Sequence, residues 1–110
     1  MANIIAETLA QTRPAGQENA YQPAAGKRGI IQTVTVCNTT NTKVKYSLFK
    51  DLDGTTYDDD SVLVKEKELP AYSSDLYTDV RWPVTTAGSF GVENHTASAC
   101  NFTIDGYEEG

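Results

Sequence analysis

The chain is poor in the residues that most often carry chemistry, with one histidine, one tryptophan, one methionine and two cysteines among 110 residues. It has no apolar run near the ~20 residues that cross a bilayer as a helix, so no membrane partner is expected. The first ten residues, MANIIAETLA, lack the basic start and long apolar core of a signal peptide, and export by that route is not indicated. Two cysteines and one distant histidine do not have the spacing of a structural zinc site.

Basic residues are also scarce. Nine Lys and Arg stand against fifteen Asp and Glu, which leaves a net charge of −6 and argues against a nucleic-acid partner. Most of the negative charge lies in residues 51–60 (DLDGTTYDDD) and near the C-terminal end. A near-neutral body with two acidic patches is typical of a domain that packs against a partner and turns its acidic loops to solvent. Solubility alone is the simpler explanation of such patches.

Short stretches of alternating apolar and polar residues recur along this chain of single-domain size. Polar, Gly-containing or Pro-containing joints separate them, at a spacing of roughly ten residues. The pattern predicts an all-β protein, an antiparallel β-sandwich of jelly-roll or immunoglobulin-like type. The expected strands cover residues 29–38, 43–51, 61–69, 73–82, 89–93 and 97–105.

The alternation also assigns faces and connections. In the strand over 29–38 it places Ile30 with Val34 and Val36, and β-branched residues on the other face predict a strand covered on both sides or forming an interface on one. In the strand over 73–82 it places Leu76 and Tyr77 on opposite faces. The polar stretch NTTNT has the length of a hairpin connection.

The N-terminal quarter differs in composition. Residues 4–12 could form a helix, but their short length and missing cap favour an extended strand. Residues 13–27 hold two prolines and two glycines and predict an extended arm. We therefore expect an N-terminal arm with the first strand over residues 1–27 and a sandwich over 28–110, with the arm becoming ordered on assembly.

Few groups could support catalysis or bind a cofactor. His95 lies in a polar turn with no nucleophile elbow near it, and no special role is expected for it. Residues 51–60 do not match an EF-hand, because Gly54 is fourth from Asp51 and the twelfth residue is Val62. A looser calcium site around Asp53 and 58–60 stays open beside the favoured reading, a solvated hairpin tip. No cofactor is expected.

Two covalent modifications need consideration. Cys37 and Cys100 both lie on expected strands, so a disulfide is possible if those strands are neighbours. In a reducing cytosol, two buried thiols are the default, and both alternatives stay open. The sequons at Asn38, Asn94 and Asn101 are interpreted as polar turn and strand residues rather than as glycan acceptors.

Five segments follow one another in a distinctive order: LAQTRPA (9–15), a Tyr-x-Pro-Ala-x-Gly-Lys arm (21–27), VCN (36–38), LYTDV (76–80) and NFTIDGYE (101–108). This order resembles a family of small β-sandwich proteins encoded among the virion genes of tailed bacteriophages. The resemblance implies a non-enzymatic structural protein of the virion, assembled in the host cytoplasm as a homo-oligomer in contact with major capsid or tail proteins. The resemblance implies no catalytic residue in this chain.

Within that family a capsid decoration protein is favoured, and a tail, neck or fibre-attachment protein is the alternative. Two other classes stay open. One is a carbohydrate- or receptor-binding module in which Tyr57, Tyr72 or Trp82 stacks on sugars, and the other is a small enzyme using His95. Exposed aromatics and arm residues are expected at assembly contacts, although the aromatics could instead pack within the fold. The residues expected there are Leu9, Arg13, Pro14, Tyr21, Pro23, Tyr77 and Trp82.

Overall fold

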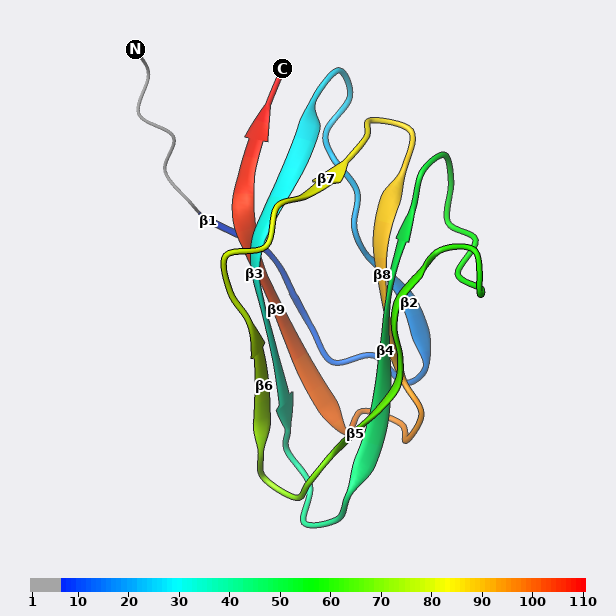
Figure 1. The fold of residues 1–110 in the computed structure, drawn as a ribbon, viewed down its shortest axis with the longest axis vertical. Helices are drawn as coiled ribbons and strands as arrows, with labels where there is room; N and C mark the ends of the chain where they lie inside the picture. The colour runs from blue at the N-terminus through cyan, green and yellow to red at the C-terminus, as the bar shows by residue number, and fades with distance from the viewer. Residues whose placement is uncertain (1–6) are drawn as a thin grey trace.

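A computed structural model describes residues 7–110 of the chain. These residues form two packed antiparallel sheets and no helix, which confirms the prediction of an all-β antiparallel sandwich (Figure 1). None of them forms a helix long and apolar enough to cross a membrane. The strands are β1 (Glu7–Thr12), β2 (Gln17–Tyr21), β3 (Arg28–Asn38), β4 (Val44–Asp51), β5 (Val62–Leu69), β6 (Ser74–Tyr77), β7 (Trp82–Val84), β8 (Ser89–Asn94) and β9 (Cys100–Glu109).

The five-stranded sheet has the order β1-β9-β3-β6, and β7 also pairs with β3. The four-stranded sheet has the order β2-β8-β4-β5. The chain therefore changes sheet at most of its connections, including the one between β3 and β4. The length of the NTTNT stretch had suggested a hairpin. The stretch instead carries the chain from one sheet to the other.

The core lies between the two sheets and consists of the inward-facing side chains of the four central strands, β3, β4, β8 and β9. Tyr46 and Phe102 meet edge to face across it, with ring centroids 6.0 Å apart. Complete burial of one large apolar side chain contributes about 1.5–3 kcal/mol to the free energy of folding. The fully buried side chains at its centre are Val34, Val36, Tyr46, Leu48, Phe90, Val92, Phe102 and Ile104.

The N-terminal segment belongs to the sandwich, which corrects the expected division at residue 27. β1 pairs with β9 in one sheet and β2 pairs with β8 in the other. The strand expected over 4–12 is confirmed from Glu7, and its first three residues lie outside the described ones. Prolines and glycines in 13–27 lie in the connections on either side of β2, where the chain changes sheet and direction.

One face assignment was wrong because it assumed uninterrupted alternation. A register shift between Ile31 and Thr33 interrupts β3, so Ile31 rather than Ile30 joins Val34 in the core cluster. Such a bulge moves every later side chain to the opposite face. On β6, Leu76 is 61% exposed and Tyr77 packs inward, which confirms that the two lie on opposite faces.

Two buried asparagines hold the turns at one end of the sandwich. Asn38 donates from Nδ2 to the carbonyl of Leu69 and accepts at Oδ1 from the amide of Thr40. Asn94 donates to the carbonyl of Pro14 and exchanges two hydrogen bonds with the backbone of Cys100. Both amide nitrogens are therefore engaged inside the fold, which agrees with the interpretation of these two sequons as structural.

Candidate functional site

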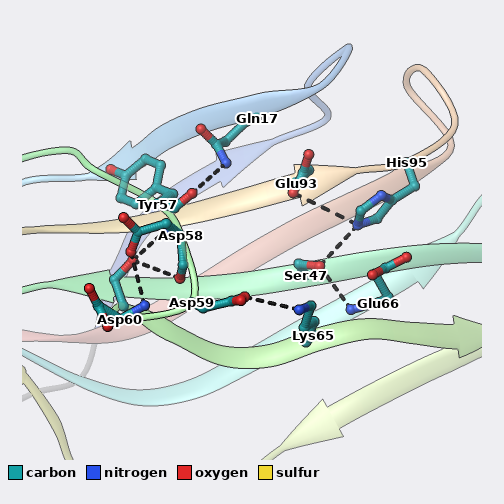
Figure 2. Close-up of polar contacts among 11 residues, drawn as sticks. Gln17, Ser47, Tyr57, Asp58, Asp59, Asp60, Lys65, Glu66, Glu93 and His95 are labelled. Carbon is teal, nitrogen blue, oxygen red and sulfur yellow. Dashed lines mark hydrogen bonds and ion pairs between the residues drawn. The ribbon is translucent and has the colours of Figure 1, made fainter.

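The acidic segment, residues 51–60, folds back onto the outer face of the four-stranded sheet. The ring of Tyr57 lies over Gly91, where an added Cβ would meet ring atoms at 2.5–2.7 Å. Its ring centroid is 5.5 Å from that of Phe49, and its hydroxyl lies 2.6 Å from Ser89 Oγ. The side-chain amide of Gln17 on β2 donates to the carbonyl of Tyr57 (Figure 2). The segment connects the antiparallel strands β4 and β5 and most of its residues are exposed, as expected of a solvated hairpin tip, but its tyrosine anchors it to the sheet.

The carboxylates of this segment mainly support its own turns. Asp51 Oδ2 accepts from the amide of Thr56 at 2.8 Å, and Asp58 Oδ1 accepts from the amide of Asp60 at 2.9 Å. Asp59 forms an ion pair with a lysine on β5 at 3.0 Å. Within residues 7–110 no group of three or more His, Cys, Asp or Glu side chains is arranged to hold a metal ion. The structure therefore adds no support for the calcium site that the sequence left open.

A small pocket of about 190 Å³ lies between the acidic segment, β4, β5 and β8. Figure 2 shows its polar side chains pointing toward one another across the outer face of the sheet. It mixes carboxylates with one lysine, one histidine and two aromatic rings. The lining residues are Ser47, Phe49, Tyr57, Asp58, Asp59, Val62, Lys65, Glu66, Glu93 and His95.

His95 has partners in this pocket that the sequence did not predict. Its Nε2 lies 2.9 Å from Ser47 Oγ and 3.8 Å from Glu93 Oε1. In a catalytic triad the carboxylate bonds to the other ring nitrogen and orients the imidazole. Here serine and carboxylate share one nitrogen, and Ser47 is only 2% exposed and already accepts from the amide of Glu66. The arrangement ties the turn after β8 to β4 and does not present an activated hydroxyl.

The two cysteines lie on neighbouring strands but on opposite faces of the sheet. Cys37 pairs with Asn101 in the β3–β9 ladder, and Cys100 pairs with Asn38 one step away. Because adjacent residues of a strand point to opposite sides, one thiol points outward and the other into the core. Both are free. Burial raises the pKa of the Cys100 thiol to about 11, so it stays protonated and unreactive near neutral pH.

Three of the residues expected at assembly contacts are buried inside the fold instead. The ring of Tyr21 packs over Gly29, and its hydroxyl donates to Glu108 Oε2 at 2.6 Å. Burial, followed by this hydrogen bond, raises the pKa of the Tyr21 phenol. Pro14 and Pro23 are buried as well. The residues that the resemblance rests on in this region therefore fix the position of the β2–β3 connection.

The other four residues expected at assembly contacts are only partly buried or exposed. Leu9, Tyr77 and Trp82 are half-buried and pack against the core cluster. Trp82 stacks on Phe90, with ring centroids 6.0 Å apart and planes 20° apart. Arg13 alone among the seven is exposed. Of the rings suggested for sugar stacking, two are engaged by neighbouring rings, and Tyr72 is 71% exposed.

The outer face of the five-stranded sheet is the surface that sequence reasoning did not single out. From Thr33 to Cys37 of β3, its side chains form three rows across the strands, defined by the cross-strand partners of β1, β9, β3 and β6. We call these rows the threonine face. The middle row is Leu76, Thr35, Thr103 and Gln11; the flanking rows are Ser74, Cys37 and Asn101, and Thr33, Asp105 and Thr8.

The threonine face is nearly uncharged in a chain of net charge −6. Asp105 is the only charged side chain in its three rows, and it accepts a hydrogen bond from Thr8 Oγ1 at 2.9 Å. All of these side chains are half-buried or exposed. The β-branched residues on both faces of β3 had indicated that one face could form an interface, but they did not indicate which strands extend it.

The free sheet edges differ in how they discourage pairing with other chains. β5 carries alternating Lys and Glu from Lys65 to Glu68, and Glu66 adopts a positive φ of 46°. β7 contains Pro83, and β6 spans only four residues. β1 has a single charged residue, Glu7, at its first position. β2, at the edge of the other sheet, also has a single charged residue, Glu18. Charges, prolines and short strands protect an edge, so β1 and β2 are the least protected.

Comparisons of this chain with protein-family models, curated proteins and solved structures find no match.

Proposed function

We propose that the protein is a non-enzymatic structural component of a tailed-phage virion, and that it decorates the capsid by contacts through its sheet face and edges. The observation that carries the proposal is the threonine face. A broad surface with a single carboxylate is unusual in a chain with fifteen acidic residues, and depletion of charge is what marks the centre of a protein interface.

The distribution of charge supports the same role. The acidic segment lies on part of the outer face of the four-stranded sheet, on the opposite side of the sandwich from the threonine face. A subunit built this way can rest one face on a partner and keep its acidic side in solvent. The weakly protected β1 edge offers a second contact, because an unpaired strand can add to a neighbouring sheet.

The segments that resemble phage virion proteins support a function based on shape. Asn38 of VCN holds two turns together, Tyr21 of the arm motif bonds to Glu108 of the terminal motif, and LAQTRPA spans β1 and the crossing to the other sheet. These motifs set the geometry of the sandwich, and they bring no reactive group into the pocket beside His95. A fixed shape presented many times is what a decoration protein needs.

The test is the number of subunits in purified particles of the phage that encodes this chain, measured by quantitative mass spectrometry against the major capsid protein. On the order of hundreds of copies is expected for a protein repeated over a symmetric shell. About six to a few dozen copies would place it on the tail or neck, which is the alternative. Its absence from the particles would contradict both.

A further inference from the structure

We propose that the threonine face binds the threonine face of a second copy, giving a two-fold symmetric dimer with the sheets packed face to face. The inference rests on the proposed function in treating this face as a contact surface, and it adds the identity of the partner. It also has a solution test that does not need the virion.

The face is self-complementary about its middle row. A two-fold axis along the row from Leu76 to Gln11 lays β3 over β3 and β9 over β9 with the strands reversed. Strands of packed sheets align within about 30° of each other, which this arrangement satisfies. Each side chain of the middle row then meets its own equivalent, so Leu76 meets Leu76 and Thr35 meets Thr35. An isologous contact of this kind closes at two copies.

The polar groups outside the middle row match under the same axis. Asn101 and Asp105 lie on β9 on either side of Thr103. The axis places Asn101 of each copy opposite Asp105 of the other, where an amide N–H can donate to the carboxylate, twice by symmetry. It places Cys37 opposite Thr33 in the same way. No two carboxylates face each other, and this is what favours a second copy over an acidic or basic partner.

The opposite face of the sandwich cannot pair in this way. The acidic segment covers it, and two copies meeting there would bring the clusters at 58–60 together. The choice of face therefore follows from the charge distribution of the chain.

The area of the threonine face sets the expected affinity of the dimer. Four strands at about 4.8 Å spacing and some six residues at about 3.3 Å rise give a face of roughly 400 Å² per copy. The total of roughly 800 Å² lies below the roughly 1,200–2,000 Å² of stable specific interfaces and in the range of weak, transient contacts. We expect a weak, concentration-dependent dimer in free solution, which high local concentration on a particle would favour.

Sedimentation velocity over a wide concentration range is the first measurement, with Asn101→Asp as the disrupting variant. It sets one carboxylate against each Asp105 across the axis, which gives two like-charge pairs in the dimer, and we expect the dimer dissociation constant to rise at least about tenfold. The exchanged variant Asn101→Asp with Asp105→Asn restores the match and should recover dimerisation. Asn19→Asp, an exposed change of the same chemistry on β2, should have no effect.

A cross-link tests the geometry itself. Thr33→Cys places a thiol opposite Cys37 of the second copy, and mild oxidation should give a covalent dimer. The two positions are four residues apart on one strand, so they span about 13 Å and cannot bond within one chain. A wild-type chain that stays monomeric at all concentrations, or an exchanged variant that fails to recover, overturns the proposal. A dimer in solution with no subunits in particles would instead count against the proposed function alone.

Discussion

At the scale of single residues, the polar side chains that look functional in the sequence mostly stabilise the fold. Within residues 7–110, no buried side-chain nitrogen or oxygen lacks a hydrogen-bond partner. Asn38 and Asn94 satisfy turn backbone, and Tyr46 donates to Asp75 Oδ2 at 2.6 Å across the gap between the sheets. Lys67 on β5 bonds to the same carboxylate, which joins the two sheets along that side.

Asn38→Ala should be strongly destabilising, because it leaves the carbonyls of Leu69 and Pro70 and the amide of Thr40 without their partner. We expect a loss of about 2–4 kcal/mol in the free energy of unfolding, measured by denaturant titration. Asn41→Ala in the same connection is exposed and should change it by less than about 0.5 kcal/mol. Equal effects of the two variants would contradict the role given to Asn38.

Alkaline pH should weaken the fold through Tyr46. Burial, followed by hydrogen bonds with Asp75 and Tyr77, raises the pKa of its phenol above the ordinary value near 10. The folded state therefore favours the neutral phenol, so its contribution is complete below pH 10 and is lost as pH rises above that value.

The measurement is the unfolding free energy between pH 8 and pH 11, about one unit or more on each side of the ordinary tyrosine pKa. It should fall above pH 10, and Tyr46→Phe should make the fall shallower. Tyr72→Phe, at a ring that is 71% exposed, should leave the slope unchanged. A slope identical in wild type and Tyr46→Phe would rule out this assignment.

At the scale of the elements, strand positions were largely predictable, and the faces of β3 were not. Alternation of side chains located β3, β4, β5 and β8 closely, and it placed the last strand at 97–105, three to four residues before β9. The register shift beside Gln32 on β3 leaves no mark in the sequence, because β-branched and polar residues fit either phase there. β2 was missed because QENAY has one large apolar residue, and its strand forms by pairing with β8. Pairing with neighbouring strands determines the register of β3 and the formation of β2, and local sequence preference does not.

The position of the acidic segment was also beyond the sequence. What anchors it is a contact between Tyr57 and Gly91, which are far apart in the chain, and only a glycine leaves room for the ring. Seven charged or polar residues around one tyrosine predict a solvent-exposed loop. The candidate pocket beside His95 depends on this folding back, so it could not be predicted either.

Gly91→Ala should release the acidic segment without unfolding the sandwich. The new methyl would overlap the ring of Tyr57, which can swing outward since it belongs to a surface loop. We expect faster hydrogen exchange over residues 52–61 and easier proteolysis there, with little change in the core strands. Gly16→Ala, where an added Cβ meets nothing within 4 Å, is the matched control. Unchanged exchange in the segment would show that another contact holds it.

At the scale of the whole molecule, the sandwich has two unlike sides. One is covered by an acidic, tyrosine-anchored segment, and the other is a broad surface of threonines with one carboxylate. Folding alone does not require this asymmetry, because an antiparallel sheet can face water with charged residues on its outer side. We therefore attribute it to a contact with a partner through the threonine face.

A charge placed at the centre of the threonine face should abolish assembly while the fold persists. Thr35→Lys puts an ammonium group in the middle row, where burial against a partner would leave it unpaired. We expect incorporation into particles to fall at least about tenfold, with an unchanged circular-dichroism spectrum. Asn41→Lys, at an exposed turn, carries the same charge and should assemble normally. Normal assembly of Thr35→Lys would place the contact elsewhere.

The rate of alkylation of Cys37 in free protein and in purified particles tests the central claim most directly. Cys37 lies on the threonine face, and Cys100, buried in the core of the same subunit, serves as an internal control that should react slowly in both states. We expect Cys37 to react at least about tenfold more slowly in particles than in dilute free protein, because a partner covers the face. Equal rates in the two states would contradict the account.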